Sequence, residues 1–169
     1  MMTDDLDEVE RRVREALVAV DAAWRDIPDS DAAWTRAIKH AVGGIGEQLG
    51  YLVCAAESRF ADNGEWLYDL TWLKVDDSKR IVLDIPLALE SEWTPDDELM
   101  FDFQKLVVSK AQHRVMVFWA ESDASADQIL TVFIDQVRRF HGSRVGDRYL
   151  FAFYVGNDRP LQFKPYVHG

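Results

Sequence analysis

Three acidic residues in the middle of the chain are the strongest candidates for chemistry. Asp69 lies in the strand-like run Leu67 to Val75, and Glu90 and Glu92 end a second run, Arg80 to about Trp93. Residues two apart in a strand share a face, so the two glutamates would lie roughly 6 to 7 Å apart, a spacing that can bracket a hard cation. Like charges gathered on one face repel unless a cation neutralises them. The pattern predicts a Mg²⁺ or Mn²⁺ site; the alternative is that these are surface acids at solvent-facing strand ends.

The register of the hairpin decides whether Asp69 can join the glutamates. The turn-forming residues Asp76-Asp77-Ser78 separate the two runs. A symmetrical turn would place Asp69 opposite Pro86, on the correct face but about two side-chain steps short of Glu90. Closer approach needs a bulge or a longer turn, and Pro86, which cannot donate to the ladder, is the expected place for the irregularity.

Other common catalytic sites find no support in the sequence. The four histidines have no metal-binding spacing, and neither a phosphate-binding P-loop nor a Gly-x-Ser-x-Gly elbow occurs. The single cysteine, Cys54, excludes an intrachain disulfide, and its apolar neighbours predict a buried, inert thiol. Gly43, Gly44 and Gly46 precede a strand, and we predict that they allow close packing of a helix.

Apolar periodicity outlines the elements that position these residues. Helices are predicted at about 6–24, 34–49, 98–112 and 129–140, and strands at 51–56, 67–75, 80–93, 114–120, 149–155 and 161–167. This order predicts one α/β domain, 1–169, with a central mixed sheet flanked by helices. Within it we expect a helical extension at 1–28, a core at 31–120, and a helix and two strands at 121–169.

The residues resemble the restriction-endonuclease-like, or PD-(D/E)XK, nuclease superfamily. The core of that superfamily runs helix, three strands, helix, strand, with an acid on the second strand, an acid-x-lysine on the third, and often a glutamate on the first helix. The resemblance covers roughly Trp34 to Ala120. It implies a restriction-endonuclease-like core with Asp69 and Glu90 as the strand acids and Glu47 as the auxiliary acid.

The chain departs from the family pattern at the lysine. Glu92 stands two residues after the third-strand acid, where the family usually has lysine. Some branches supply the lysine from the following helix, and Lys105 resembles that arrangement. Helical geometry sets Lys105 nearly opposite one apolar stripe, although Phe101 and Val108 flank it, so which side faces the sheet is open. The residues of that stripe are Leu99, Phe103, Leu106 and Val107.

The resemblance implies metal-dependent hydrolysis of phosphodiester bonds in nucleic acid. Asp69 and Glu90, with Glu92 and Glu47, would hold Mg²⁺ or Mn²⁺, which polarises the phosphate and lowers the pKa of the attacking water. Lys105 would stabilise the developing charge or position that water. The alternative is a catalytically inactive protein of the same fold that acts as a protein-binding or assembly module.

Charge and apolar patterning limit the partners. Thirty acidic residues against 19 basic give a net charge of -11, which repels nucleic acid at long range. Residues 84–102 carry seven acids and no base, whereas 138–164 carry six bases and two acids, which makes the second segment the predicted phosphate-contacting surface. An acidic N-terminus and the lack of a long apolar run predict a cytoplasmic protein without membrane contact. The apolar stripe of 6–24 either forms a homodimer interface or packs on its own domain.

Overall fold

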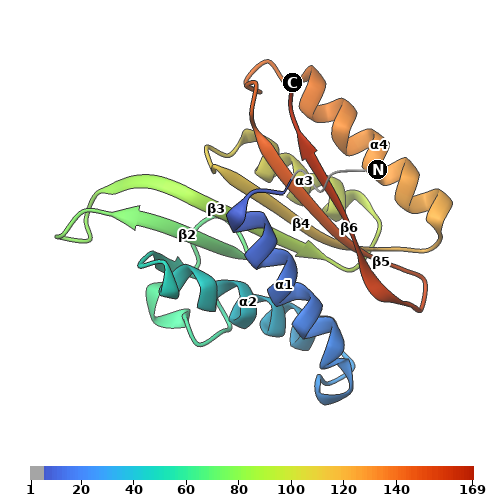
Figure 1. Ribbon diagram of the computed structural model, residues 1–169, viewed down its shortest axis with the longest axis horizontal. Helices are drawn as coiled ribbons and strands as arrows, with labels where there is room; N and C mark the ends of the chain where they lie inside the picture. The colour runs from blue at the N-terminus through green and yellow to red at the C-terminus, as the bar shows by residue number, and fades with distance from the viewer. Residues whose placement is uncertain (1–5) are drawn as a thin grey trace.

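A six-stranded mixed sheet runs through the described part of the molecule (Figure 1). The computed structural model describes residues 6–169, without the side chains of residues 158 and 159. The strands lie in chain order, with β3, β4 and β5 parallel and the other neighbours antiparallel. Their bounds are β1 (Leu52–Cys54), β2 (Leu70–Val75), β3 (Val82–Glu92), β4 (His113–Ala120), β5 (Arg148–Val155) and β6 (Asp158–Val167).

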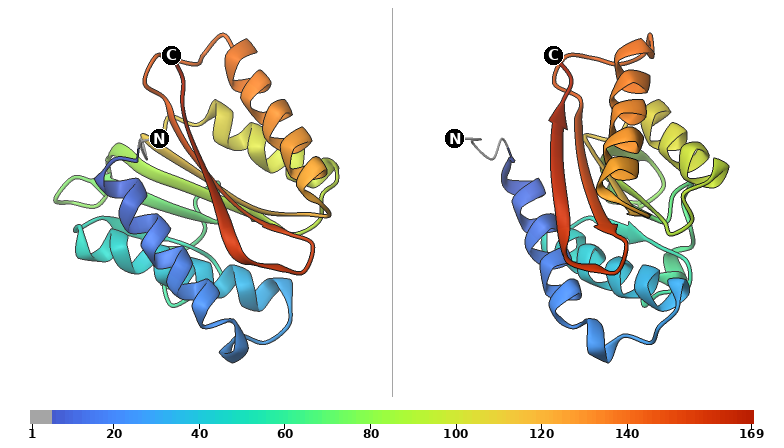
Figure 2. Two further views of the ribbon diagram at one scale, coloured as in Figure 1. Left: turned by 45° about the vertical axis from the view of Figure 1, so that its right-hand side comes forward. Right: turned by 90° about the vertical axis from the view of Figure 1, so that its right-hand side faces the viewer.

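Helices cover both faces of this sheet (Figure 2). On one face lie α1 (Glu8–Ala22) and α2 (Asp31–Gln48), and on the other α3 (Asp97–Val108) and α4 (Asp123–Arg139). The predicted order of elements and the mixed sheet flanked by helices are therefore confirmed. Each face has its own apolar core. Among the described residues, none of the helices combines the length and the apolar character that a membrane span requires.

The apolar stripe of α1 packs inside its own domain. Val13 and Leu17 are fully buried in the core beneath α1 and α2. Asp7 starts the helix through a capping box with Glu10. Of the two uses predicted for this stripe, packing on its own domain is the one observed, so a homodimer would need another surface.

Helix α3 ends four residues earlier than the periodicity predicts. Its last helical residue is Val108, and Ser109 is extended. The cause is Arg114 on β4, whose buried guanidinium donates hydrogen bonds to the carbonyls of Leu106 (3.1 Å) and Ser109 (3.0 Å). These bonds satisfy carbonyl groups that the end of a helix leaves without partners.

The glycines of α2 allow close packing at two of three positions. A Cβ atom at Gly46 would lie 2.6 Å from Nε1 of the buried Trp72, and one at Gly43 would lie 2.2 Å from the Phe60 ring. At Gly44 the nearest atom is 3.4 Å away, at the end of the flexible Arg59 side chain. The predicted role in helix packing is thus confirmed for Gly43 and Gly46.

Two alanine substitutions in α2 should therefore have opposite effects. We expect Gly46→Ala to lower the free energy of unfolding by about 1–3 kcal/mol, because its methyl group overpacks against Trp72. Gly44→Ala should raise it by up to about 1 kcal/mol, because alanine favours a helix and meets no fixed atom. Urea denaturation measures both, and equal effects would contradict the packing role of Gly46.

Candidate functional site

Two irregularities in the β2–β3 hairpin bring Asp69 beside Glu90. Trp72 pairs with Leu87 but Lys74 pairs with Asp84, so one residue of β2 faces two of β3. The two are residues 85 and 86, which confirms the irregularity predicted at the proline. A second shift lies closer to the turn. The two shifts move the pairing by two residues, and the turn, which Val75 and Val82 close one residue later than a symmetrical turn at Asp77-Ser78, moves it by two more. The Asp69 backbone N–H therefore donates to Oε2 of Glu90 at 3.2 Å.

Glu90 lies on the face of the sheet that α3 covers. Only 1% of the residue is exposed, and its Oε1 contacts the Nζ of Lys105. The same ammonium also lies 3.1 Å from Oδ1 of Asp102. Although the stripe of α3 is buried as a helix–sheet contact, the long Lys105 side chain still reaches the acid. The structure therefore resolves the orientation that the sequence left open.

Burial controls the protonation of this pair. It raises the pKa of Glu90 to about 8, against the opposing effect of Lys105, and the negative charge of Asp69 acts in the same direction as burial. Burial by itself would lower the pKa of Lys105, but the contacts with Glu90 and Asp102 together raise it. The lysine thus stays charged where Glu90 changes its protonation state.

Asp69 points towards the opposite face, where α2 lies. Its Oδ2 accepts hydrogen bonds from the backbone N–H (2.9 Å) and the hydroxyl (2.8 Å) of Ser91, and its Oδ1 lies 3.8 Å from Nζ of Lys39. The prediction that Asp69 shares a face with Glu90 is wrong. Asp69 lies one residue before β2, which begins at Leu70, so the alternation of side chains along the strand does not fix the direction of its side chain.

Lys39 is the residue that the sequence reasoning missed. It is buried on α2 and donates to the carbonyl of Ala56 at 3.2 Å. Together with Asp31, Thr35 and Asp69 it lines a cavity of about 280 Å³. In the sequence it stands next to Ile38, as surface lysines beside an apolar stripe often do. No local signal separates it from them.

The other two predicted acids have partners of their own. The Glu92 carboxylate accepts the backbone N–H groups of Trp93 and Thr94, both at 2.8 Å, and so shapes the turn that ends β3. Glu47 forms an ion pair with Arg59 at 2.7 Å on the surface. Within residues 6–169, no group of three or more His, Cys, Asp or Glu is placed to hold a metal ion. The structure brings together Asp69, Glu90 and Lys105, and the contacts of Glu92 and Glu47 lie elsewhere.

Arg148 and Cys54 both make contacts within the fold. Arg148, from the basic segment 138–164, forms ion pairs with Glu10 (2.6 Å) and Asp7 (3.2 Å). It stands at the start of β5 beside the first turn of α1, which leaves less of that segment for phosphate contact. Cys54 is buried, and burial raises the pKa of its thiol, in accord with the inert thiol predicted for it.

Comparisons of the chain with models of protein families, with curated proteins and with solved structures find no match.

Proposed function

We propose that this protein is a divalent-metal-dependent, nuclease-like protein with a restriction-endonuclease-like core that hydrolyses phosphodiester bonds of nucleic acid. The observation that carries the proposal is that the two acids are neighbours where β2 and β3 meet, with the backbone N–H of Asp69 donating to Glu90 and Lys105 contacting Glu90. The succession of α2, β1, β2, β3, α3 and β4 agrees with the order of elements in that superfamily. Asp69 and Glu90 are the proposed metal ligands, and Lys105 the proposed phosphate-contacting cation.

The donor set suits Mg²⁺ in a phosphate site. Such an ion usually keeps several waters and is held by one or two carboxylates together with the phosphates of the substrate. The Asp69 side chain is 26% exposed, and its Oδ1 lies 3.8 Å from Nζ of Lys39. Because the two carboxylates point to opposite faces of the sheet, the Glu90 side chain would have to turn from Lys105 towards Asp69 for both to hold the ion, which would polarise the phosphate and lower the pKa of the attacking water. With only two carboxylates, we expect weak metal binding until a nucleic acid is present.

The lysines supply the positive charge for this chemistry. Lys39 reaches Asp69 from α2, and Lys105 reaches Glu90 from α3, so each acid has one cation on its own face of the sheet. Cations placed at a developing phosphorane charge stabilise the transition state. Lys39 is buried, which strengthens its interaction with a charge at the cavity beside Asp69.

The test is metal-dependent cleavage of labelled DNA and RNA, single-stranded and double-stranded, in Mn²⁺ and in Mg²⁺. We expect Asp69→Asn to reduce cleavage at least about a hundredfold, because it weakens a metal ligand. Glu47→Gln is the matched control and should cleave like the wild type, since Glu47 pairs with Arg59. Calorimetric titration of the metal in the presence of a non-cleavable nucleic acid reports binding separately from cleavage. Cleavage by Asp69→Asn at the wild-type rate would overturn the proposed site.

The second candidate function is a catalytically inactive protein-binding or assembly module of the same fold. It is favoured by the partners that the acids already have. Asp69 accepts two hydrogen bonds from Ser91, and Glu90 accepts one from Asp69 and contacts Lys105. Acids used in this way hold β2, β3 and α3 together without metal. This candidate predicts no cleavage by the folded wild type, with or without metal, and a loss of stability in Asp69→Asn.

A further inference from the structure

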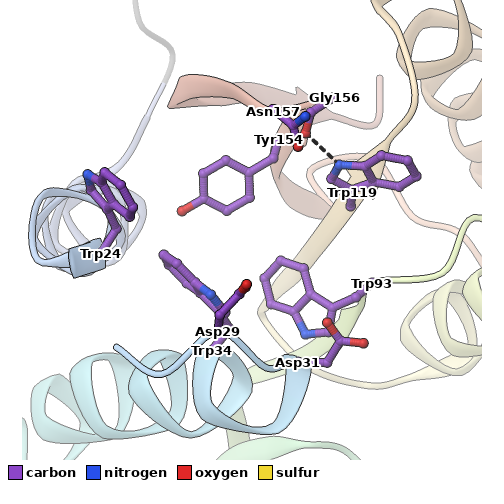
Figure 3. A pocket seen from close by; sticks show the side chains of 9 residues that line it. All are labelled: Trp24, Asp29, Asp31, Trp34, Trp93, Trp119, Tyr154, Gly156 and Asn157. Carbon is purple, nitrogen blue, oxygen red and sulfur yellow. Dashed lines mark hydrogen bonds between the residues drawn. The ribbon is translucent and has the colours of Figure 1, made fainter. Parts of the chain in front are cut away.

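An aromatic cavity opens at the carboxyl ends of the parallel strands (Figure 3). Trp93 directly follows β3, Trp119 lies near the end of β4, and Tyr154 lies near the end of β5. Trp34 of α2 and Trp24 complete the aromatic wall of the cavity, which has a volume of about 640 Å³. In open α/β sheets, ligands bind outside the carboxyl ends of the strands. The volume also lies within the range of small-molecule sites.

The rings meet at angles and do not form a parallel slot. The Trp34 ring centroid lies 5.8 Å from that of Tyr154 and 6.4 Å from that of Trp93, with interplanar angles of 71° and 58°. Trp93 and Tyr154 are 6.3 Å apart and tilted by 31°. A flat base stacks best between parallel rings, whereas one small cation can contact several ring faces, each within about 6 Å.

Hydrogen bonds to the protein fix three of these aromatic side chains. The indole N–H of Trp93 donates to Oγ1 of Thr35 at 2.9 Å, and that of Trp119 donates to the carbonyl of Gly156 at 2.7 Å, the dashed line of Figure 3. The Tyr154 hydroxyl donates to Oδ1 of Asp21 at 2.9 Å. A wall fixed in this way needs little ordering when a ligand enters, so less affinity is lost.

The charge on the cavity wall is negative. Asp29 and Asp31 belong to the lining, and none of the lining residues that the structure describes is a lysine or an arginine. Both carboxylates are exposed and lie on the α2 side of the opening (Figure 3). Acidic groups at the mouth of a cavity attract cations and repel phosphates. This charge favours a cationic ligand over a nucleotide.

We propose that this cavity binds an organic cation whose ammonium group carries alkyl substituents. Alkyl groups bury apolar area against the indoles, and the charge contacts the ring faces. A bare ammonium is strongly hydrated and loses more on entering. The ligand is either a small alkylammonium compound or the alkylated side chain of a lysine. The proposal does not depend on nucleic-acid cleavage.

Calorimetric titration compares choline with the neutral alcohol in which carbon replaces the nitrogen of choline. We expect the cation to bind at least about tenfold more tightly, because the two compounds share a shape and differ in charge. Trp34→Leu and Asp31→Asn should each weaken choline binding several-fold to about tenfold. The matched control, Trp66→Leu, removes an indole outside the cavity and should bind choline like the wild type. Circular dichroism verifies that each variant is folded, and Asp31→Asn serves as the independent test if Trp34→Leu does not fold.

Three results would overturn the proposal. The first is equal affinity for the cation and the neutral alcohol. The second is that Asp31→Asn and a folded Trp34→Leu both bind choline with wild-type affinity. The third is that adenosine binds more tightly than choline and is not displaced by it. The last would assign the cavity to a nucleobase. A further comparison separates the two sources of the cation. A peptide with a trimethylated lysine binds more tightly than free trimethyllysine if the source is a protein, and no more tightly if it is a small molecule.

Discussion

Replacing Lys105 with methionine is expected to lower the free energy of unfolding by about 3–5 kcal/mol above about pH 8. The reason is Glu90, which is 1% exposed and faces Lys105. Methionine keeps much of the length of the side chain and removes its charge. The buried carboxylate would then have no cation beside it, although the backbone N–H of Asp69 would still donate a hydrogen bond to it. Urea denaturation followed by circular dichroism measures the change.

The loss should depend on pH in a definite direction. The pKa of Glu90 is raised to about 8 by burial, above its usual value of 4.5. The folded state therefore holds this proton where the unfolded chain has released it. The stabilising contribution of the protonated Glu90 is complete below the unfolded pKa and disappears as the pH rises through the folded pKa. Near pH 5, where Glu90 is neutral, Lys105→Met should therefore cost much less than above about pH 8.

Two further variants make this prediction specific. In Lys105→Met/Glu90→Gln both charges are absent, so most of the lost stability should return at high pH. Lys110→Met changes an exposed lysine just beyond α3 and should have little effect at any pH. If Lys105→Met lowered the free energy of unfolding equally at both pH values, the loss would not come from the interaction of Lys105 with Glu90.

Phe103→Ala should be the most damaging truncation in α3, with a cost of about 3–5 kcal/mol. The ring of Phe103 is fully buried and stacks on that of Phe133 with centroids 3.9 Å apart. It also lies 5.8 Å from the ring of Phe151 on β5. Removing it leaves a cavity between α3, α4 and the sheet that these rings cannot refill.

The control for this truncation lies two residues away on the same helix. Phe101 is 62% exposed, so we expect Phe101→Ala to change stability by no more than about 0.5 kcal/mol. Denaturation of the two variants thus determines which side of α3 faces the sheet. If Phe101→Ala cost as much as Phe103→Ala, the side of α3 that carries Phe101 would be packed against the sheet, which would contradict the burial of the Phe103 side.

Periodicity predicted the order of the elements because each helix and strand buries one regular face. The position of the hairpin irregularity was predicted from Pro86, because proline has no N–H to donate to the ladder. The face of Asp69 was not predictable, because this residue lies one position before β2, where the alternation of strand side chains no longer applies. The end of α3 depends on Arg114 of the next strand, a tertiary contact that helix periodicity does not encode.

The sequence predicts those functional candidates whose residues stand close together along the chain. Asp69 and Glu90 stand in a recognisable pattern along two adjacent strands. Lys39 and the residues of the aromatic cavity form no such sequence pattern, because the residues that they contact come from segments far apart in the chain. Trp34, Trp93 and Trp119 are separated by more than twenty residues each. Only the sheet brings them to one edge.

The two outer strands of the sheet limit how molecules of this protein can associate. In the described residues, β1 at one edge is 3 residues long, and β6 at the other contains Pro160 and Pro165 among its 10 residues. A short strand offers few backbone groups for pairing, and proline has no N–H to donate. Both edges are therefore poor templates for the intermolecular strand pairing that leads to aggregation. Concentrated solutions should stay free of cross-β assemblies as long as the domain is folded.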